Sequence, residues 1–299
     1  MKAKTASLHK QARQSYLSHY AMLSPFLIAF IMFTILPILA SMLLGFTDFN
    51  MVQLPNFVGL DNYVRLLFDD DVYMIALKNT LLLALVTGPI GYILSFVVAW
   101  LINELGRRFR VLFTFLMYTP AMCAAASTIW IFIFSSDTQG FLNDILLKLG
   151  VITTPVSWLT DPTYNMTVVM IITIWGSFGT GFLSFVSGLQ SLDRTYFEAA
   201  AIDGLRNRWQ ELYYVTFPQM REFLLFGAVQ SVSSAFSIAP TITGNPSTNY
   251  STHTLVLHIL DHANIRYEMG YASAAAVVLF LLMILAWTAT NKLLSKVSA

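Results

Sequence analysis

The chain has 299 residues, of which 56% are hydrophobic and only 11% are charged, and its formal net charge is +1. A soluble domain carries roughly a quarter charged residues, so this composition, with a mean hydropathy of +0.64, excludes a water-soluble globular protein. The apolar residues come in runs of about twenty, long enough to cross a hydrocarbon layer about 30 Å thick. The single cysteine, Cys123, allows no internal disulfide.

Six apolar runs separated by polar breaks predict six membrane-spanning helices, because open backbone cannot face lipid. A polar tail, residues 1–20, precedes the first run, which we interpret as an uncleaved span rather than a signal peptide. Pro37, Pro89 and Pro120 lie inside the first three runs and are expected to kink them. The predicted spans are residues 21–46, 79–102, 111–134, 167–186, 223–239 and 271–294.

Basic residues gather on one side of these spans. Of the 17 lysines and arginines, all but Arg65, Lys78, Lys148 and Arg266 fall in the N-terminal tail, the loops after the second and fourth spans, and the C-terminal end. By the positive-inside rule, both termini and residues 192–221 are predicted to be cytoplasmic.

Every acidic and basic residue falls in a loop or at a helix end in this assignment. A carrier driven by its own proton or sodium coupling usually needs ionisable groups within the membrane. The chain also has no glycine-rich phosphate loop that ends in Gly-Lys-Ser or Gly-Lys-Thr, so it is not itself an ATPase. We predict no enzymatic activity and no cofactor, and active transport by this chain would need energy from another subunit.

Between the fourth and fifth spans, residues 192–221 predict two short helices with a turn at Gly204, whose backbone is permissive. Trp209 and Tyr213 would share one side of the second helix, and Pro218 is expected in the first turn of the next span. Such an exposed apolar helix fits a groove on another protein. From the residues alone, it fits equally well a helix that lies on the bilayer surface.

Four short groups within this segment carry a resemblance to a known family: Glu198-Ala199-Ala200, Ile202-Asp203-Gly204, Trp209-Gln210 and Thr216-Phe217-Pro218. Together they resemble the cytoplasmic coupling loop of the permease subunits of binding-protein-dependent carbohydrate ABC importers. The spacing from Gly204 to Pro218 is one residue longer than is commonest there. Elsewhere the chain is similar to the first permease of maltose/oligosaccharide and glycerol-phosphate importers at residues 57–63, 79–80, 140–143, 158–159 and 270–274.

The resemblance implies an all-α fold with a cytoplasmic tail (1–20), a peripheral first helix with an external segment (21–74), and a five-helix permease core (75–299). It implies a bacterial inner-membrane location and, as partners, a second permease, two cytoplasmic ATP-binding subunits, an extracytoplasmic substrate-binding protein and membrane lipid, but no nucleic acid. ATP binding to the partners would drive alternating access in this chain. The residues implied to couple it to the ATPase are Glu198, Ala199, Ala200, Asp203, Gly204, Trp209 and Pro218.

Polar side chains line one side of the fourth and fifth spans, and a neutral, hydroxyl-rich path suits an uncharged sugar. Small hydroxyl residues in membrane helices also serve as packing contacts. The alternative function is an ATP-independent facilitator for small neutral solutes, which leaves residues 192–221 without a role. The candidate path residues are Thr173, Ser177, Thr180, Gln230, Ser234 and Ser237.

His258, Asp261 and His262, with His253 nearby, have the helical spacing of a metal cluster. They fall in the polar external loop before the last span. We prefer to interpret them as a solvated helix face that contacts a partner, so no metal site is predicted.

Overall fold

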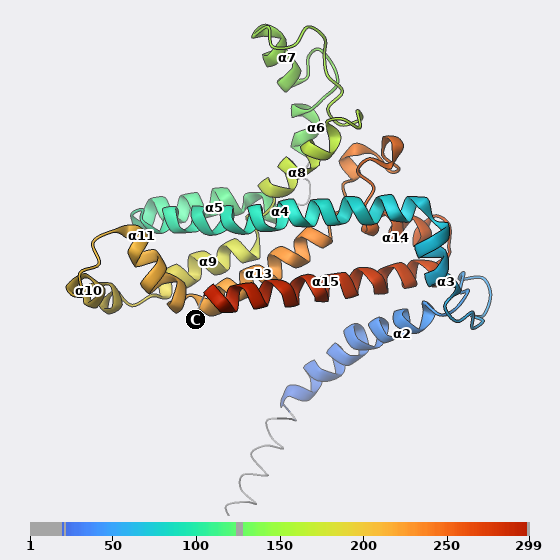
Figure 1. Ribbon diagram of the computed structural model, residues 1–299, viewed down its shortest axis with the longest axis horizontal. Helices are drawn as coiled ribbons and strands as arrows, with labels where there is room; N and C mark the ends of the chain where they lie inside the picture. Colours follow the sequence, from blue (N-terminus) through green and yellow to red (C-terminus); the bar gives the residue numbers. More distant parts are fainter. Residues whose placement is uncertain (1–19, 21, 124–127, 298–299) are drawn as a thin grey trace, which may run out of the picture.

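The computed structural model describes residues 20, 22–123 and 128–297 (Figure 1). The all-helical class is confirmed for these residues, among which the only β contact is an isolated bridge between Thr47 and Phe57. The α-helices are α2 (Leu36–Leu44), α3 (Asp61–Val64), α4 (Asp71–Asn103), α5 (Arg107–Met122), α6 (Ile129–Ile133), α7 (Phe141–Lys148), α8 (Asn165–Trp175), α9 (Thr180–Ser191), α10 (Arg194–Ile202), α11 (Arg208–Glu211), α12 (Phe217–Gln219), α13 (Arg221–Phe236), α14 (Leu255–Asn264) and α15 (Met269–Val297).

Five helical stretches in the described part of the chain are long and apolar enough to cross a membrane. They correspond to the first, second, fourth, fifth and sixth predicted spans. The most apolar part of the first stretch has no residue buried in the protein, and Figure 1 shows this stretch running away from the other helices. The five stretches are Met22–Leu44, Asp71–Asn103, Asn165–Ser191, Arg221–Thr243 and Met269–Leu294.

The third predicted span, residues 111–134, is not one continuous described helix. Helix α5 has 16 residues and ends at Met122, two residues after Pro120, and Cys123 has an extended backbone. Residues 124–127 lie outside the described part of the chain, and the short helix α6 follows them. Proline therefore lies in the last turn of a helix here rather than in the middle of one.

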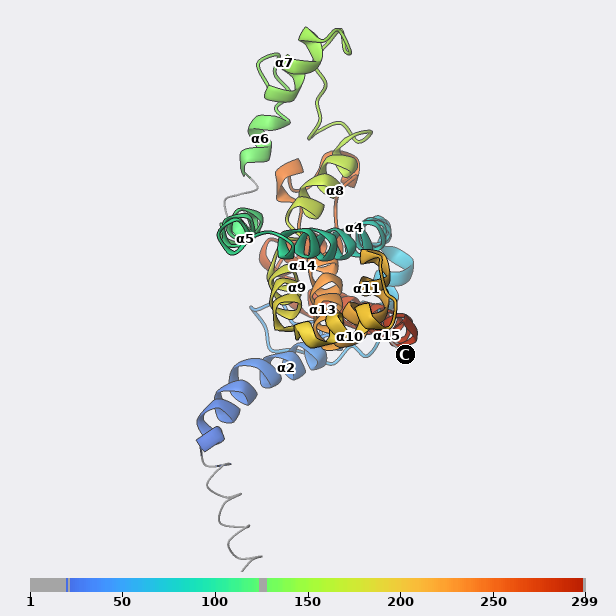
Figure 2. The same cartoon turned by 90° about the vertical axis from the view of Figure 1, so that its left-hand side faces the viewer.

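The fourth span was predicted as a helix over residues 167–186, and the structure interrupts this helix. Helix α8 ends at Trp175 and α9 begins at Thr180, with Gly179 outside the helical conformation between them (φ −97°, ψ −145°). Figures 1 and 2 both show α9 lying in the bundle while α8 leaves it toward α7. Two glycines within four residues, Gly176 and Gly179, lower the cost of leaving the helical conformation at this point.

The core of the bundle is formed by α4, α9, α13 and α15, which lie side by side in both views. Aromatic side chains fill its centre: Phe185 of α9 stands edge-on to Phe96 of α4, with ring centroids 5.6 Å apart. Gly227 on α13 faces the same ring, and a Cβ there would lie 2.3 Å from Phe185. Large and small residues thus interdigitate between the helices.

Residues 135–164, here called the α7 lobe, are organised by the buried side chain of Asn143. Its Nδ2 donates to the carbonyl oxygens of Ser135 and Val156, both at 3.0 Å. Its Oδ1 accepts hydrogen bonds from the Val156 amide at 3.2 Å and from Trp158 Nε1 at 2.8 Å. One amide side chain therefore satisfies donors and acceptors from both ends of the lobe.

Replacing Asn143 by alanine is expected to destabilise the α7 lobe by about 3 kcal/mol, because several buried polar groups lose their partners together. Hydrogen exchange of the amides in residues 135–159 measures this effect. The matched control is Asp144→Ala, which removes only an exposed ion pair with Lys148 and is expected to cost less than about 1 kcal/mol. Equal exchange rates in the two variants would contradict this role of Asn143.

Candidate functional site

Residues 192–221 lie at one end of the helical bundle, beside the C-terminal end of α15 (Figures 1 and 2). Helix α10 begins after Asp193, whose carboxylate accepts a hydrogen bond from the amide of Thr195 at 3.0 Å. Helix α11 begins after Asn207, whose side chain accepts one from the Trp209 amide at 3.2 Å. Both helices therefore carry an N-cap residue of the preferred type.

Gly204 ends α10 in a conformation that other residues rarely adopt. Its φ is +95°, and its amide donates to the Ala201 carbonyl at 3.2 Å, while the Leu205 amide donates to the Ala200 carbonyl at 3.0 Å. This pair of bonds is the Schellman motif, in which glycine supplies the left-handed residue. The direction in which the chain leaves α10 thus depends on Gly204.

The seven candidate coupling residues differ in exposure. Ala200 is buried, whereas the other six have exposed side chains or, for Gly204, an exposed backbone. Ile202 and Trp209 are large apolar residues that are 87% and 66% exposed. Pro218 lies in the short α12, and Met220 separates it from α13, so it does not open the fifth span as predicted.

Several contacts attach this segment to α4, among them an aromatic pair and an ion pair close to its C-terminal end. The ring of Trp209 lies 5.4 Å from the ring of Trp100, measured between centroids. Arg208 pairs with Glu104 at the C-terminal end of α4, at 2.9 Å, and with Glu211 at 3.0 Å. A displacement of the segment would therefore act directly on the end of the longest core helix.

A cavity of about 280 Å³ opens between α4, α8, α9 and α13. Five candidate path residues line it: Thr173, Ser177, Thr180, Gln230 and Ser234. The sixth, Ser237, does not. The sequence did not predict the contribution of the second span, which supplies Thr87, Tyr92 and Ser95 to the lining. It also did not predict Ser231 on α13. None of the described lining residues carries a charge.

Hydrogen bonds between helices hold several of these polar groups in place. Gln230 Nε2 donates to Thr180 Oγ1 at 2.7 Å, which joins α13 to α9. Ser231 Oγ donates to the Gly88 carbonyl at 2.8 Å, which joins α13 to α4. Ser95 Oγ contacts Ser177 Oγ at 3.3 Å, at the break between α8 and α9. The cavity therefore combines fixed polar groups with the glycine-rich break in the fourth span.

The interpretation of His258 and His262 as part of a solvated helix face was wrong. The two side chains are 2% and 1% exposed, because α14 packs its histidine face against the start of α4 and of α15. Asp261, on a different side of α14, pairs with Arg266 at 2.9 Å.

Comparisons with known proteins show similarity to membrane transport proteins over most of the chain. The chain is 30% identical over 281 residues to the probable ABC transporter permease protein YesP of Bacillus subtilis, covering 92% of this chain and 89% of that protein. It is 29% identical over 262 residues to the lactose transport system permease protein LacF of Rhizobium radiobacter, covering 85% of each. A chain from the crystal structure of a bacterial ABC transporter involved in alginate import shares the fold, with a TM-score of 0.74, 21% identity, and coverage of 98% of this chain and 100% of that chain.

The match to a family model is more extensive than any single motif. The model of the binding-protein-dependent transport system inner membrane component matches residues 89–297, which include residues 192–221 and all the cavity-lining residues except Thr87. This is a family of transport components and not of enzymes. The chain belongs to the binding-protein-dependent transport system inner membrane components, as a multi-pass membrane permease of an ABC importer.

Proposed function

We propose that this permease carries sugars or oligosaccharides into the cell and that ATP hydrolysis by separate subunits drives it. The observation that carries the proposal is the family match over residues 89–297, together with relatives named for lactose and arabinooligosaccharide transport. The neutral, hydroxyl-lined cavity supports an uncharged polyol as cargo, because such a solute needs hydrogen bonds and no charge partner. No charged side chain is present in the described lining to hold an acidic substrate.

The assembly in which the permease works follows from the same proposal. This chain pairs with a second permease, two cytoplasmic ATP-binding subunits and an extracytoplasmic substrate-binding protein. It has six spans, the third of which is residues 111–134, and both termini are cytoplasmic. Residues 1–20 form a tail, 21–74 a peripheral helix with its external segment, and 75–299 the core. The positive-inside distribution of arginine and lysine supports this orientation.

Residues 192–221 couple this chain to the ATPase. Glu198, Ala199, Asp203 and the exposed Trp209 offer a surface beyond the end of the bundle. When the ATP-binding subunits close, motion of this surface passes through the Trp209–Trp100 and Arg208–Glu104 contacts into α4. The cavity beside α4 then switches between inward- and outward-facing states.

Transport in reconstituted vesicles tests this function. The chain, its partner permease, the ATPase and the binding protein are placed in proteoliposomes, and uptake of a labelled oligosaccharide is followed. Uptake that needs both ATP and the binding protein is expected. Uptake by this chain alone, without ATP, would instead identify a facilitator.

The cavity gives a further expected result. Ser234→Leu fills part of the cavity and removes a hydroxyl, and uptake is expected to fall about tenfold or more, as a loss of about 1.4 kcal/mol in binding would produce. The matched control is Ser237→Leu, three residues further along, which lies outside the cavity lining. Equal losses in the two variants would contradict the assignment of this cavity to the sugar path.

A further inference from the structure

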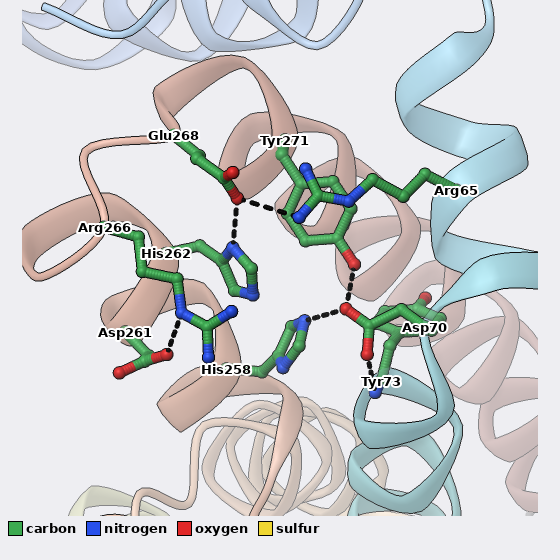
Figure 3. A network of polar contacts seen from close by, with 9 residues as sticks. All are labelled: Arg65, Asp70, Tyr73, His258, Asp261, His262, Arg266, Glu268 and Tyr271. Carbon is green, nitrogen blue, oxygen red and sulfur yellow. Dashed lines mark hydrogen bonds and ion pairs between the residues drawn. The ribbon is translucent and has the colours of Figure 1, made fainter.

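A buried cluster of histidines and carboxylates lies at the end of the bundle opposite to residues 192–221 (Figures 1 and 3). His258 and His262 are one helical turn apart on α14 and share a face. Asp70 comes from the N-cap of α4, and Glu268 lies just before α15. Neither the coupling segment nor the cavity uses these residues.

Buried polar residues of α4 hold α14 in this place. Asn79 Nδ2 donates to the carbonyl oxygens of Tyr250 and His253, at 3.0 and 2.9 Å. Thr80 Oγ1 accepts a hydrogen bond from the Leu255 amide, at the first turn of α14, at 2.9 Å. These bonds fix the start of α14 against α4, so the histidine face of α14 is directed toward Asp70.

The potential ligand atoms converge on one point. One oxygen of Asp70 and one ring nitrogen from each of His258 and His262 lie within 4.8 Å of one another. His258 Nε2 is 3.5 Å from Asp70 Oδ2, without the geometry of a hydrogen bond. Tetrahedral zinc with bonds of about 2.0–2.2 Å to nitrogen and oxygen has ligand atoms about 3.4 Å apart. The distance of 3.5 Å between His258 Nε2 and Asp70 Oδ2 matches this separation.

Both Nε2 atoms lack a hydrogen-bond partner in the part of the chain that the structure describes. His258 and His262 are 2% and 1% exposed, and their Nε2 atoms are buried. An unsatisfied buried polar atom costs about 1–3 kcal/mol, and two in one place call for an explanation.

The surrounding groups orient these atoms as the outer groups of a metal site do. His262 Nδ1 lies 2.8 Å from Glu268 Oε2, which places the ring proton on Nδ1 and leaves the Nε2 lone pair facing His258 (Figure 3). This carboxylate–histidine pairing is typical of metal ligands. Asp70 is fixed by hydrogen bonds from the Tyr73 amide to Oδ1 and from the Tyr271 hydroxyl to Oδ2.

The charges in the cluster favour a cation. Arg65 is paired with Glu268 at 3.1 Å, and Arg266 with Asp261 at 2.9 Å, so these four charges offset one another. Asp70 forms no salt bridge with a lysine or arginine among the described residues, and its contact is with His258. One carboxylate charge, that of Asp70, is therefore left without a lysine or arginine partner beside the two imidazoles.

We propose that Asp70, His258 and His262 bind one divalent transition-metal ion, Zn²⁺ by preference, through Asp70 Oδ2 and the two Nε2 atoms. Two imidazoles and one carboxylate are a common zinc ligand set. The ion ties the start of α4 to helix α14, which are far apart in the sequence, and Glu268, just before α15, holds His262 in position. This proposal replaces the expectation of no metal site, because that expectation rested on a solvated helix.

Metal binding to the purified protein tests the proposal. The chain, with a tag that contains no histidine and in complex with its partner subunits, is stripped with a chelator and titrated with Zn²⁺ and with Co²⁺ alone. One Zn²⁺ per chain is expected, with a visible Co²⁺ spectrum of tetrahedral nitrogen and oxygen ligation and a Zn²⁺-dependent rise in unfolding temperature.

Variants identify the ligands. Asp70→Asn keeps an N-cap acceptor for α4 but removes the anionic ligand, and His258→Gln removes one imidazole. Each is expected to lose about 100-fold or more in Zn²⁺ affinity, and Glu268→Gln, which affects a positioning residue, about tenfold. The matched control Asp261→Asn, on the same helix but outside the ligand set, is expected to bind as the unchanged chain does.

Two results would overturn the proposal, and the first of them is measured on the unchanged chain alone. The first is an unchanged chain that holds no Zn²⁺ and gives no Co²⁺ spectrum. The second is an equal Zn²⁺ affinity in Asp70→Asn, His258→Gln and the control Asp261→Asn. That result would place the ion on other histidines.

Discussion

Replacing Gly204 by valine is expected to reduce ATP-dependent uptake about five- to thirty-fold while the helical bundle stays assembled. Gly204 has a φ of +95°, and a left-handed conformation costs an L-residue roughly 1–2 kcal/mol, more for a β-branched one. That cost is relieved by breaking the Schellman hydrogen bonds to Ala200 and Ala201. Helix α10 then points elsewhere, and the surface around Glu198 no longer meets the ATPase in the required orientation.

The control uses the same position. Gly204→Asn adds a side chain of similar size, and an added Cβ meets no atom within 4 Å at this position, but asparagine tolerates the left-handed region. ATPase activity and uptake are measured together in proteoliposomes. We expect Gly204→Val to lose uptake per ATP hydrolysed and Gly204→Asn to keep most of it. If the two variants transport equally, the backbone at Gly204 does not orient the coupling segment.

Replacing Gly270 by alanine is expected to lower the free energy of unfolding by about 3 kcal/mol or more, because the added methyl group has no room. A Cβ at Gly270 would lie 1.9 Å from the Thr47 carbonyl oxygen. The Gly270 amide also donates to the Phe49 carbonyl at 2.9 Å. In the Gly270→Ala variant, the loop after α2 must therefore move away from α15.

That movement breaks further contacts, because Asn62 Nδ2 donates to the Gly45 and Thr47 carbonyl oxygens at 3.0 and 2.8 Å. The measurement is the unfolding temperature of the detergent-solubilised complex, together with protease cleavage in residues 45–58. Gly106→Ala is the control, since an added methyl there meets no atom within 4 Å. The same unfolding temperature in both variants would contradict the close contact between Gly270 and Thr47.

The sequence was sufficient to locate most of the helices. Runs of about twenty apolar residues can be read directly, and five predicted spans have matching long helices among the described residues. The break between α8 and α9 was missed because glycine is also tolerated inside continuous membrane helices. Gly176 and Gly179 lower the cost of a break, and contacts with neighbouring helices, here through Ser95 and Gln230, accompany it.

At the candidate sites, too, the sequence did not predict which residues of different helices come together. Spacing predicted that His258 and His262 share a helix face, but not that Asp70 and Tyr271 cover it, because those two residues come from other elements. Hydroxyl stripes indicated the sides of α9 and α13 that line the cavity. The share contributed by α4, at Thr87 and Ser95, needed the packing of the helices.

Coupling to an external ATPase is tested by purification of the tagged chain from native membranes in mild detergent, with identification of the co-purifying chains by mass spectrometry. We expect a second six-helix permease and an ATPase with a phosphate loop, with two copies of the ATPase for each copy of this chain. In the Gly204→Val variant the second permease is expected to remain while the ATPase is reduced. Recovery of the chain alone, or only with copies of itself, would contradict the central claim that an external ATPase drives it through residues 192–221.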